Sequence, residues 1–383
     1  MNRRDFLKSL SVVPFLHLVA NSEALATERN SVVVLVELKG GNDSLNTLIP
    51  YQDAAYYQLR PKLALPQQQV LNIGEGMGMH PALRPLLPLW NNKEMAWIQG
   101  IGVPGQEQAR SHFTSIQQWE TSSIDQNNDQ GWVSQVFRQT NPALQGMVIG
   151  NELGPLLGNS FNAINLHDPD EFVQYLDKLR SLKALRSNPS HNNPMLVHIF
   201  DMQEKLLSAG AQISRQLAAN QGIKQQFPAG DFGASLASVA RMIVSDFKIP
   251  VYKVSLGNFD THVSQAPLHQ RLLHELAQGL GAFYKVLHQQ GKWDDVMVVT
   301  YSEFGRRAAE NHSLGTDHGS AAAHFALGGA VKGGFYGQHP DLAALNAGDV
   351  QYHVDFRSLY STLARRWWQK DSPWSMPDIP FIA

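Results

Sequence analysis

The chain has 383 residues, with 31 Lys and Arg, 33 Asp and Glu, and a formal net charge of −2 at pH 7. This near-neutral balance argues against a polybasic surface for nucleic acid or anionic lipid. There is no cysteine, which excludes disulfides, thiolate metal ligands and a cysteine nucleophile. Any bound metal must therefore be held by His, Asp, Glu or hydroxyl oxygen, which suits zinc, manganese, magnesium, calcium or iron.

The first 26 residues are expected to be an export signal rather than part of the fold. Residues 2–8 are charged and contain paired arginines, residues 10–20 form a short apolar run, and residues 24–26 form a small-x-small cleavage site. The apolar run is too short to span a bilayer, so no stable membrane anchor is predicted. The paired arginines resemble a twin-arginine signal. We therefore expect the twin-arginine machinery to export the folded protein to the periplasm or beyond; the alternative is an ordinary N-terminal helix.

Beyond residue 30 the chain alternates predicted strands with predicted helices. Apolar and β-branched runs predict strands at residues 31–38, 94–99, 250–256, 295–301 and 323–331. Helices are predicted at residues 81–90, 111–119, 171–185, 195–219, 234–247, 266–290 and 355–368. This alternation is typical of an α/β fold, here a three-layer sandwich with a mostly parallel central sheet. We expect one domain over residues 30–383, with a helical elaboration near residues 160–230.

Three of the predicted strands are each followed by a carboxylate in a turn. Asp43 follows the first strand and two glycines, Asp260 follows the strand at 250–256, and Glu303 follows the strand at 295–301. Ligands gather beyond the carboxyl ends of parallel strands, so these side chains should lie near one another. One such residue alone is more often a turn residue or a helix cap. The three together indicate a metal site.

Histidines accompany these carboxylates. His262 follows Asp260 by two residues, and His324 follows the adjacent pair Asp317-His318 by six. Neighbouring residues on a strand point to opposite faces, but the glycines flanking Asp317-His318 allow a turn that brings both to one metal. The alternative is that Asp317 only orients His318.

Ser111 opens the predicted helix at residues 111–119. Free backbone N–H groups at a helix start favour an anion, and a metal beside the hydroxyl would make it a nucleophile toward phosphorus or sulfur. The alternative is that Ser111 only caps the helix. His112 is open to three interpretations: a metal ligand, an acid that assists the leaving group, or a packing residue. Arg110 and Arg306 are candidate clamps for an anion.

Taken together, the motifs resemble a known family. They are Gly40-Gly41-Asn42-Asp43, Arg110-Ser111-His112-Phe113, Phe259-Asp260-Thr261-His262, Ser302-Glu303-Phe304-Gly305-Arg306 and Gly315-Thr316-Asp317-His318-Gly319. With the N-terminal signal, they look like the exported bacterial family called domain of unknown function 1501. That family is similar to the alkaline phosphatase and sulfatase superfamily, whose members bind two divalent metals and use a hydroxyl or modified nucleophile at a helix start.

The resemblance implies roles for individual residues. Asp43 would match the superfamily's metal-bridging aspartate, Ser111 its nucleophile, and Asp317-His318 its Asp-His metal pair. The superfamily's pair usually follows its strand directly, whereas Glu303 takes that place in this sequence. Either Glu303 or the later pair is therefore the strand-end ligand.

The implied function is an exported, metal-dependent hydrolase of phosphate or sulfate esters, acting on a small molecule or a polymer. It would hold one or two divalent ions of zinc, manganese, magnesium or calcium. The resemblance assigns the other metal to Asp260, His262 and His324. The alternative is a non-catalytic binding or assembly protein of the cell envelope, in which metal only stabilises the fold.

Overall fold

The computed structural model describes residues 31–105, 110–124, 128–138, 144–159, 161–166 and 217–383. The predicted signal at residues 1–26 lies outside this part, as do the helix predicted at 171–185 and most of that at 195–219. Most of the expected elaboration at 160–230 also lies outside it. Within the described part, no helix combines the length and apolar character needed to cross a bilayer.

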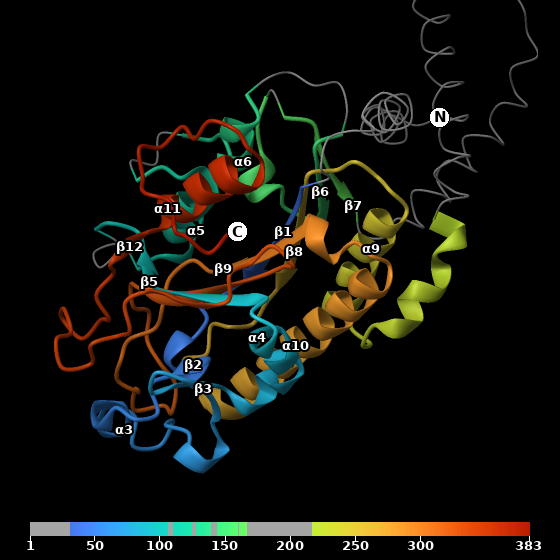
Figure 1. The fold of residues 1–383 in the computed structure, drawn as a ribbon. Coiled ribbons are helices and arrows are strands. Elements are labelled where there is room, and N and C mark those ends of the chain that lie inside the picture. The colour runs from blue at the N-terminus through green and yellow to red at the C-terminus, as the bar shows by residue number, and fades with distance from the viewer. Residues whose placement is uncertain (1–30, 106–109, 125–127, 139–143, 160, 167–216) are drawn as a thin grey trace, which may run out of the picture.

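A nine-stranded sheet forms the centre of the molecule (Figure 1). Its order is β11-β5-β10-β9-β1-β8-β6-β7, and β12 also pairs with β5. The strands are β1 (Val32–Leu38), β5 (Met95–Gly102), β6 (Gly146–Ile149), β7 (Ala163–Leu166), β8 (Val251–Leu256), β9 (Val296–Tyr301), β10 (Ala322–Leu327), β11 (Gly334–Gly337) and β12 (Val354–Asp355). Every pairing is parallel except the two that β10 makes with β5 and β9. The prediction of a mostly parallel α/β sheet is confirmed.

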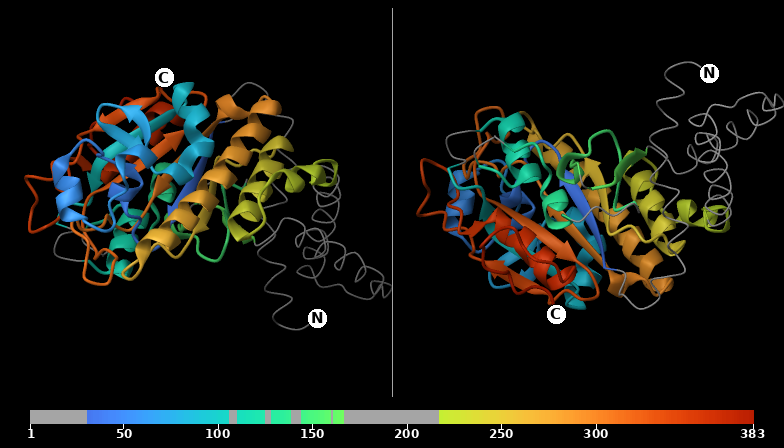
Figure 2. Two further views of the ribbon diagram at one scale, coloured as in Figure 1. Left: turned by 90° about the horizontal axis from the view of Figure 1, so that it is seen from below. Right: turned by 90° about the horizontal axis from the view of Figure 1, so that it is seen from above.

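Helices cover both faces of the sheet, as the two turned views show (Figure 2). One face carries η3 (Pro81–Leu86), α4 (Leu87–Asn91), α9 (Asp231–Val244) and α10 (Gln265–Gln289); the other carries α5 (His112–Thr121), α6 (Trp132–Val136) and α11 (Phe356–Thr362). Because side chains alternate along a strand, Val34 of β1 packs into the hydrophobic core under the first group of helices, and Leu35 packs into the core under the second group. The predicted three-layer arrangement is therefore confirmed.

Several predicted elements differ in detail from the structure. The predicted helix at residues 81–90 is divided into η3 and α4, since Pro85 within it has no N–H to donate. The predicted helix at 355–368 ends in a π-helical turn, η9 (Leu363–Trp367). The strand predicted at 323–331 stops at Leu327, just before two consecutive glycines.

Shorter elements complete the described part of the chain. A second sheet has the order β2-β4-β3. Its strands are β2 (Leu48–Ile49), β3 (Leu71–Gly74) and β4 (Met77–Met79). The remaining helices are α3 (Ala54–Leu59) and the 3-10 turns η1 (Ser44–Asn46), η2 (Gln67–Gln69), η5 (Gly154–Leu156), η7 (Gln221–Gln226) and η8 (Trp293–Asp295).

The topology places the predicted site residues at one edge of the sheet. Strands β9, β1 and β8 are parallel neighbours, so the turns that follow them lie side by side. Gly40, at the end of β1, has a φ of +115°, and a Cβ there would collide with the backbone nitrogen of Asp260. Glycine at this position therefore lets the turn after β1 approach the turn after β8.

Candidate metal centre

Three histidines converge on the carboxylate of Asp260. Nε2 of His262 lies 3.0 Å from Oδ1 of Asp260, and Nε2 of His318 lies 3.1 Å from the same oxygen. Nε2 of His112 lies 3.4 Å from Oδ2. The histidines arrive from the loop after β8, from the loop between β9 and β10, and from the first turn of α5. Segments distant in the sequence thus bring four donor groups together.

Each of these imidazoles is also held at its other nitrogen, Nδ1, by an oxygen atom. The pairs are His112 with Glu303 at 3.3 Å, His262 with Asp317 at 3.3 Å, and His318 with the backbone carbonyl of Arg110 at 2.9 Å. A histidine that donates from Nδ1 presents the lone pair of Nε2, which is how metal-binding histidines are usually oriented. All three rings are therefore arranged as ligands.

The donor atoms fit a divalent cation. Nε2 of His112 is buried and makes no hydrogen bond to any residue that the structure describes. Nε2 of His262 and Nε2 of His318 lie only 2.9 Å apart, a distance at which two lone pairs repel unless a proton or cation lies between them. One ligand atom from each of His112, Asp260 and His318 lies within 4.8 Å of the others, and His262 lies beside this group. Imidazole nitrogens with one carboxylate match the ligand preferences of zinc, manganese or iron better than those of magnesium or calcium.

Arg306 fixes the position of Asp260. Its side chain is fully buried, and Nη2 contacts Oδ1 of Asp260 at 2.7 Å. Nη2 also donates to the backbone carbonyls of Gly40 and Phe259, and Nε and Nη1 donate to those of Gly41 and Thr316. Arg306 was predicted to clamp a bound anion; in the structure these hydrogen bonds join the turns after β1 and β8 to the loop that carries His318.

The charges around the centre favour an ionised Asp260. Burial would raise the pKa of this carboxyl, but the hydrogen bond from Arg306 and the charge of its guanidinium lower it to about 2. Burial lowers the pKa of His318, so its ring favours the neutral form that a metal requires. The hydrogen bond to Glu303 raises the pKa of His112.

Glu303 and Asp317 orient histidines in this arrangement. Besides His112, Glu303 accepts hydrogen bonds from the backbone N–H groups of Gly40 at 2.7 Å and Gly41 at 3.0 Å. Asp317 accepts from Asn311 at 3.0 Å as well as contacting His262. The sequence left open whether Glu303 or the Asp317-His318 pair supplies the strand-end ligand. In the structure His318 contacts Asp260, whereas Glu303 and Asp317 contact the Nδ1 atoms of His112 and His262.

Asp43 is not brought into this group. Its buried Oδ2 lies 2.6 Å from Nη1 of Arg60 and also accepts a hydrogen bond from Gln265. Burial would raise the pKa of Asp43, but the charge of Arg60 lowers it. The predicted metal-bridging aspartate is therefore one half of a buried ion pair, with Arg60 also donating to Asn46 at 2.9 Å.

Replacing Asp43 with asparagine should destabilise the fold by roughly 3 kcal/mol, because Arg60 would be left as a buried charge without its counter-ion. Urea unfolding measures this loss. Because the native pKa of Asp43 is depressed, the stabilisation is complete above its unfolded pKa and is lost as pH falls through the native value. The paired change Asp43→Asn with Arg60→Met should recover part of the loss. If Asp43→Asn lowered the metal content of the protein without lowering its stability, Asp43 would instead be a metal ligand.

His324 also lies outside the group. It is buried in β10, its ring packs edge-on against Trp119 with centroids 5.3 Å apart, and neither ring nitrogen has a hydrogen-bond partner in the described residues. Burial lowers the pKa of His324 to about 3, so the ring is neutral. The prediction that it ligates a second metal has no support in this placement.

Ser111 is exposed at the start of α5, directly before His112, and its side chain makes no capping hydrogen bond. The carbonyl of Arg110 contacts His318, and His112 lies beside Asp260, so the chain is tied to the centre on both sides of Ser111. The Arg110 side chain, the other predicted clamp, pairs with Asp349 at 2.8 Å.

Some supporting residues were not predicted from the sequence. Phe304 packs against the rings of His112 and His318, with centroids 5.0 and 4.4 Å apart. Arg60, which directly follows α3, and Gln265, the first residue of α10, hold Asp43, and neither lies in a recognisable motif. Phe304 lies within a quoted motif, but nothing in that pattern indicates ring packing.

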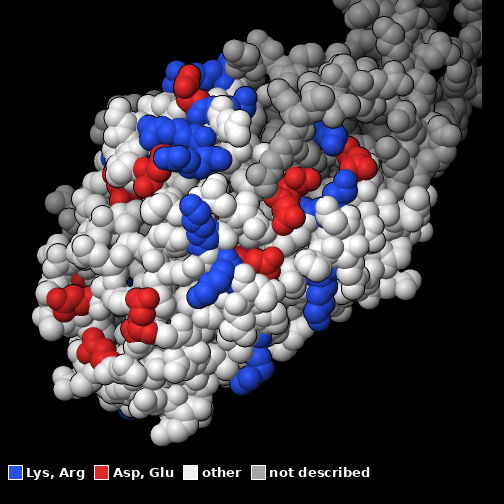
Figure 3. Space-filling model, in the orientation of Figure 1, with Lys and Arg blue, Asp and Glu red and all other residues white. Residues whose placement is uncertain are grey.

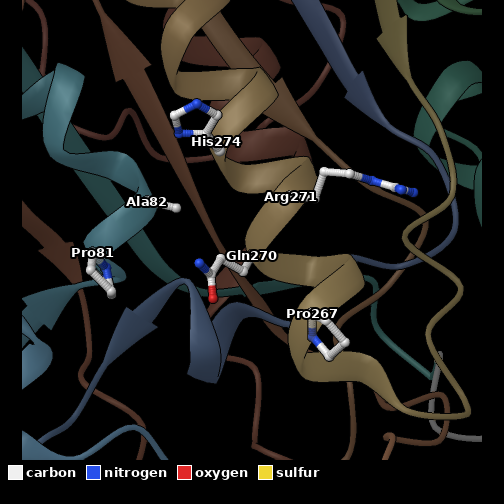
Figure 4. A pocket seen from close by; sticks show the side chains of 6 residues that line it. All are labelled: Pro81, Ala82, Pro267, Gln270, Arg271 and His274. Carbon is white, nitrogen blue, oxygen red and sulfur yellow. The ribbon is translucent and has the colours of Figure 1, made fainter.

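The face seen in Figure 3 mixes acidic and basic side chains, with no extended area of one sign. A hollow of about 580 Å³ between η3 and α10 is lined by Pro81, Ala82, Pro267, Gln270, Arg271 and His274 (Figure 4). None of the residues that converge on Asp260 lines it. A second hollow, of about 540 Å³, runs along α5, the helix whose first residue is His112.

Comparisons with known proteins relate the chain to one family and to several solved structures. The model of the family described as "Protein of unknown function (DUF1501)" matches residues 172–367. No curated protein matches the sequence.

The similar solved structures include the lipoteichoic acid synthase LtaP from Listeria monocytogenes, 10% identical, with 84% of this chain and 71% of that one covered and a TM-score of 0.33. PsFucS1 sulfatase from Pseudoalteromonas sp. is 10% identical, with 100% and 76% covered and a TM-score of 0.42. A protein in the alkaline phosphatase superfamily from Vibrio parahaemolyticus is 9% identical, with 93% and 74% covered and a TM-score of 0.39.

Proposed function

The chain belongs to the DUF1501 family of proteins of unknown function, and from its site geometry we propose that it is a metal-dependent hydrolase of phosphate or sulfate esters. The observation that supports this most is the convergence of the Nε2 atoms of His112, His262 and His318 on Asp260. A divalent cation held there would neutralise charge on the transferring group and lower the pKa of a nearby hydroxyl.

Ser111 is the proposed nucleophile. It immediately precedes His112, it is exposed, and its side chain does not cap the N–H groups of the first turn of α5, which at a helix start favour an anion. The serine oxygen would form a bond to phosphorus or sulfur, its proton would pass to solvent, and the ester's alcohol would leave. Water would then cleave the seryl ester, releasing phosphate or sulfate and restoring the hydroxyl.

The positions of the charged groups support this assignment of roles. The buried Arg306 contacts Oδ1 of Asp260, the oxygen that His262 and His318 also approach, while Oδ2 faces Nε2 of His112. Glu303 and Asp317 orient His112 and His262 without themselves lying in the convergent set. The chain thereby builds a rigid set of ligands, the preorganisation that electrostatic catalysis requires.

Ser111→Ala is expected to reduce kcat toward aryl phosphate or aryl sulfate by at least about a thousandfold, as loss of a serine nucleophile does in other hydrolases. The bound metal should remain, since Ser111 is outside the ligand set. The measurement is turnover together with elemental analysis of the same sample. Thr114→Ala, which removes another hydroxyl from the first turns of α5, is the matched control and should retain turnover.

Undiminished turnover in Ser111→Ala would refute the assignment of the nucleophile. A metal-loaded wild-type protein that cleaves neither phosphate monoesters, phosphate diesters nor sulfate esters would refute the hydrolase and favour a binding role.

We further propose that the protein acts in the periplasm or outside the cell after twin-arginine export. The paired arginines near the N-terminus support this location, and their replacement by lysines should retain the protein in the cytoplasm.

A further inference from the structure

The second hollow runs along α5, the helix that begins at the proposed active site. It has a volume of about 540 Å³ and lies between α5 and the loop that follows β6. Its lining includes Ile116, Gln117 and Glu120 from α5, and Glu152, Leu153 and Leu157 from the loop and η5.

Helix α5 connects the hollow to the metal centre. Its first residue, His112, points to Asp260, and Ile116 lies one turn further along, about 6 Å along the axis. Phe113, Ile116, Gln117 and Glu120 are spaced at i, i+3, i+4 and i+7, so they share one side of the helix. Phe113 is therefore the member of this row that is nearest the centre.

Lys39 makes a second connection. Its Nζ contacts Glu152, a lining residue, at 2.8 Å. Lys39 directly precedes Gly40, whose N–H donates to Glu303 beside His112. An ester whose acidic group reached the centre could therefore extend its alcohol part along α5 without crossing another layer of the fold.

The lining combines apolar surface with hydrogen-bond acceptors. Leu153 and Leu157 offer aliphatic surface, whereas Glu120, Glu152 and Gln117 offer carboxylate and amide oxygens. Phe113 lies outside this lining, at the end of the α5 row that is nearer the centre, and 87% of its surface is exposed, the largest fraction among the large exposed hydrophobic residues of the described chain. An exposed aromatic ring stacks on the C–H face of a sugar, and carboxylates accept its hydroxyl protons. Lys253 pairs with Glu120 at 3.0 Å and Lys39 pairs with Glu152 at 2.8 Å, and each carboxylate keeps lone pairs for a sugar hydroxyl.

We propose that the hollow along α5 is a subsite for a neutral carbohydrate, the alcohol part of the ester that the centre hydrolyses. The assignment of this carbohydrate as the alcohol part of a hydrolysed ester rests on the proposed function. Saccharide binding at the subsite can nevertheless be measured without any hydrolysis.

The test is saturation-transfer NMR on the full mature protein with methyl glycosides of glucose, galactose, mannose, fucose and N-acetylglucosamine. At least one should bind with a Kd of about 1 mM. Phe113→Ala should weaken that binding at least about tenfold. Val263→Ala is the matched control, because Val263 is also an exposed apolar residue, at 66%, and follows a histidine of the centre but lies outside the α5 row.

Glu152→Gln provides a second variant and should also weaken saccharide binding, because it replaces an acceptor oxygen with a donor. The subsite is refuted if no glycoside binds, if Phe113→Ala and Glu152→Gln both bind like the wild type, or if octyl phosphate competes while glycosides do not. None of the glycosides is a phosphate or sulfate ester, so failure of the hydrolase proposal would appear separately as absent turnover.

Discussion

Replacing His318 with alanine is expected to lower the affinity for a divalent metal by about 100-fold or more and to remove hydrolytic activity. The Nε2 of His318 lies 2.9 Å from that of His262 and 3.1 Å from Asp260, which places it centrally among the donor atoms. Elemental analysis after dialysis against limiting zinc or manganese measures the loss. Circular dichroism of the same samples establishes that the fold is intact.

His274→Ala is the matched control for this prediction. His274 is a histidine of α10 that lines the hollow in Figure 4 and takes no part in the set around Asp260. Its replacement should leave metal content and turnover unchanged. Equal metal content in His318→Ala and the wild type would contradict the proposed centre.

Replacing Arg306 with lysine is expected to lower the free energy of unfolding by about 3–5 kcal/mol. A lysine has one compact ammonium and cannot reproduce the forked contacts by which the buried guanidinium joins Asp260 to four backbone carbonyls. Those carbonyls would lose their donors, and the turns after β1 and β8 would separate. Urea unfolding measures the stability, and metal titration should show weaker binding because Asp260 is no longer fixed.

Arg307→Lys is the natural comparison, since it makes the same chemical change at the next position. The Arg307 side chain is partly exposed, and its Nε lies 3.7 Å from Asp349. Its replacement should change the unfolding free energy by less than about 1 kcal/mol. If Arg306→Lys were no more destabilising than Arg307→Lys, the role of Arg306 as the support of Asp260 would be wrong.

The main features of the fold could be predicted because they follow from the pattern of apolar residues along the sequence. The buried strands at residues 31–38, 250–256 and 295–301 contain enough consecutive apolar residues to be recognised, and their adjacency brings the turns after them together. Strands β6 and β7 could not be predicted, because each has four residues and too little pattern to distinguish it from a loop. The divided helix at residues 81–90 reflects Pro85.

The site was partly predictable for a similar reason. The residue types around Asp260, His262 and His318 indicated metal ligands, and these three lie together. The sequence could not distinguish them from Asp43, because the counter-ion that engages Asp43 is Arg60, which lies in a segment without a motif. Nor could it indicate that His324 is enclosed by Trp119, since the contact joins α5 to β10.

The roles of the neighbouring groups required the three-dimensional arrangement. Glu303 occupies the strand-end position predicted for a ligand, yet its oxygens face the Nδ1 of His112 and two backbone N–H groups. Spacing along the chain does not determine which nitrogen of an imidazole faces which carboxylate. That distinction separates a ligand from the residue that orients it.

The most direct test of the proposed centre is anomalous diffraction from crystals of the protein grown with zinc or manganese. We expect one strong peak about 2.0–2.3 Å from the Nε2 atoms of His112 and His318 and from an oxygen of Asp260. A peak coordinated instead by Asp43 or His324, or no peak near Asp260 in protein that binds the metal in solution, would contradict the central claim.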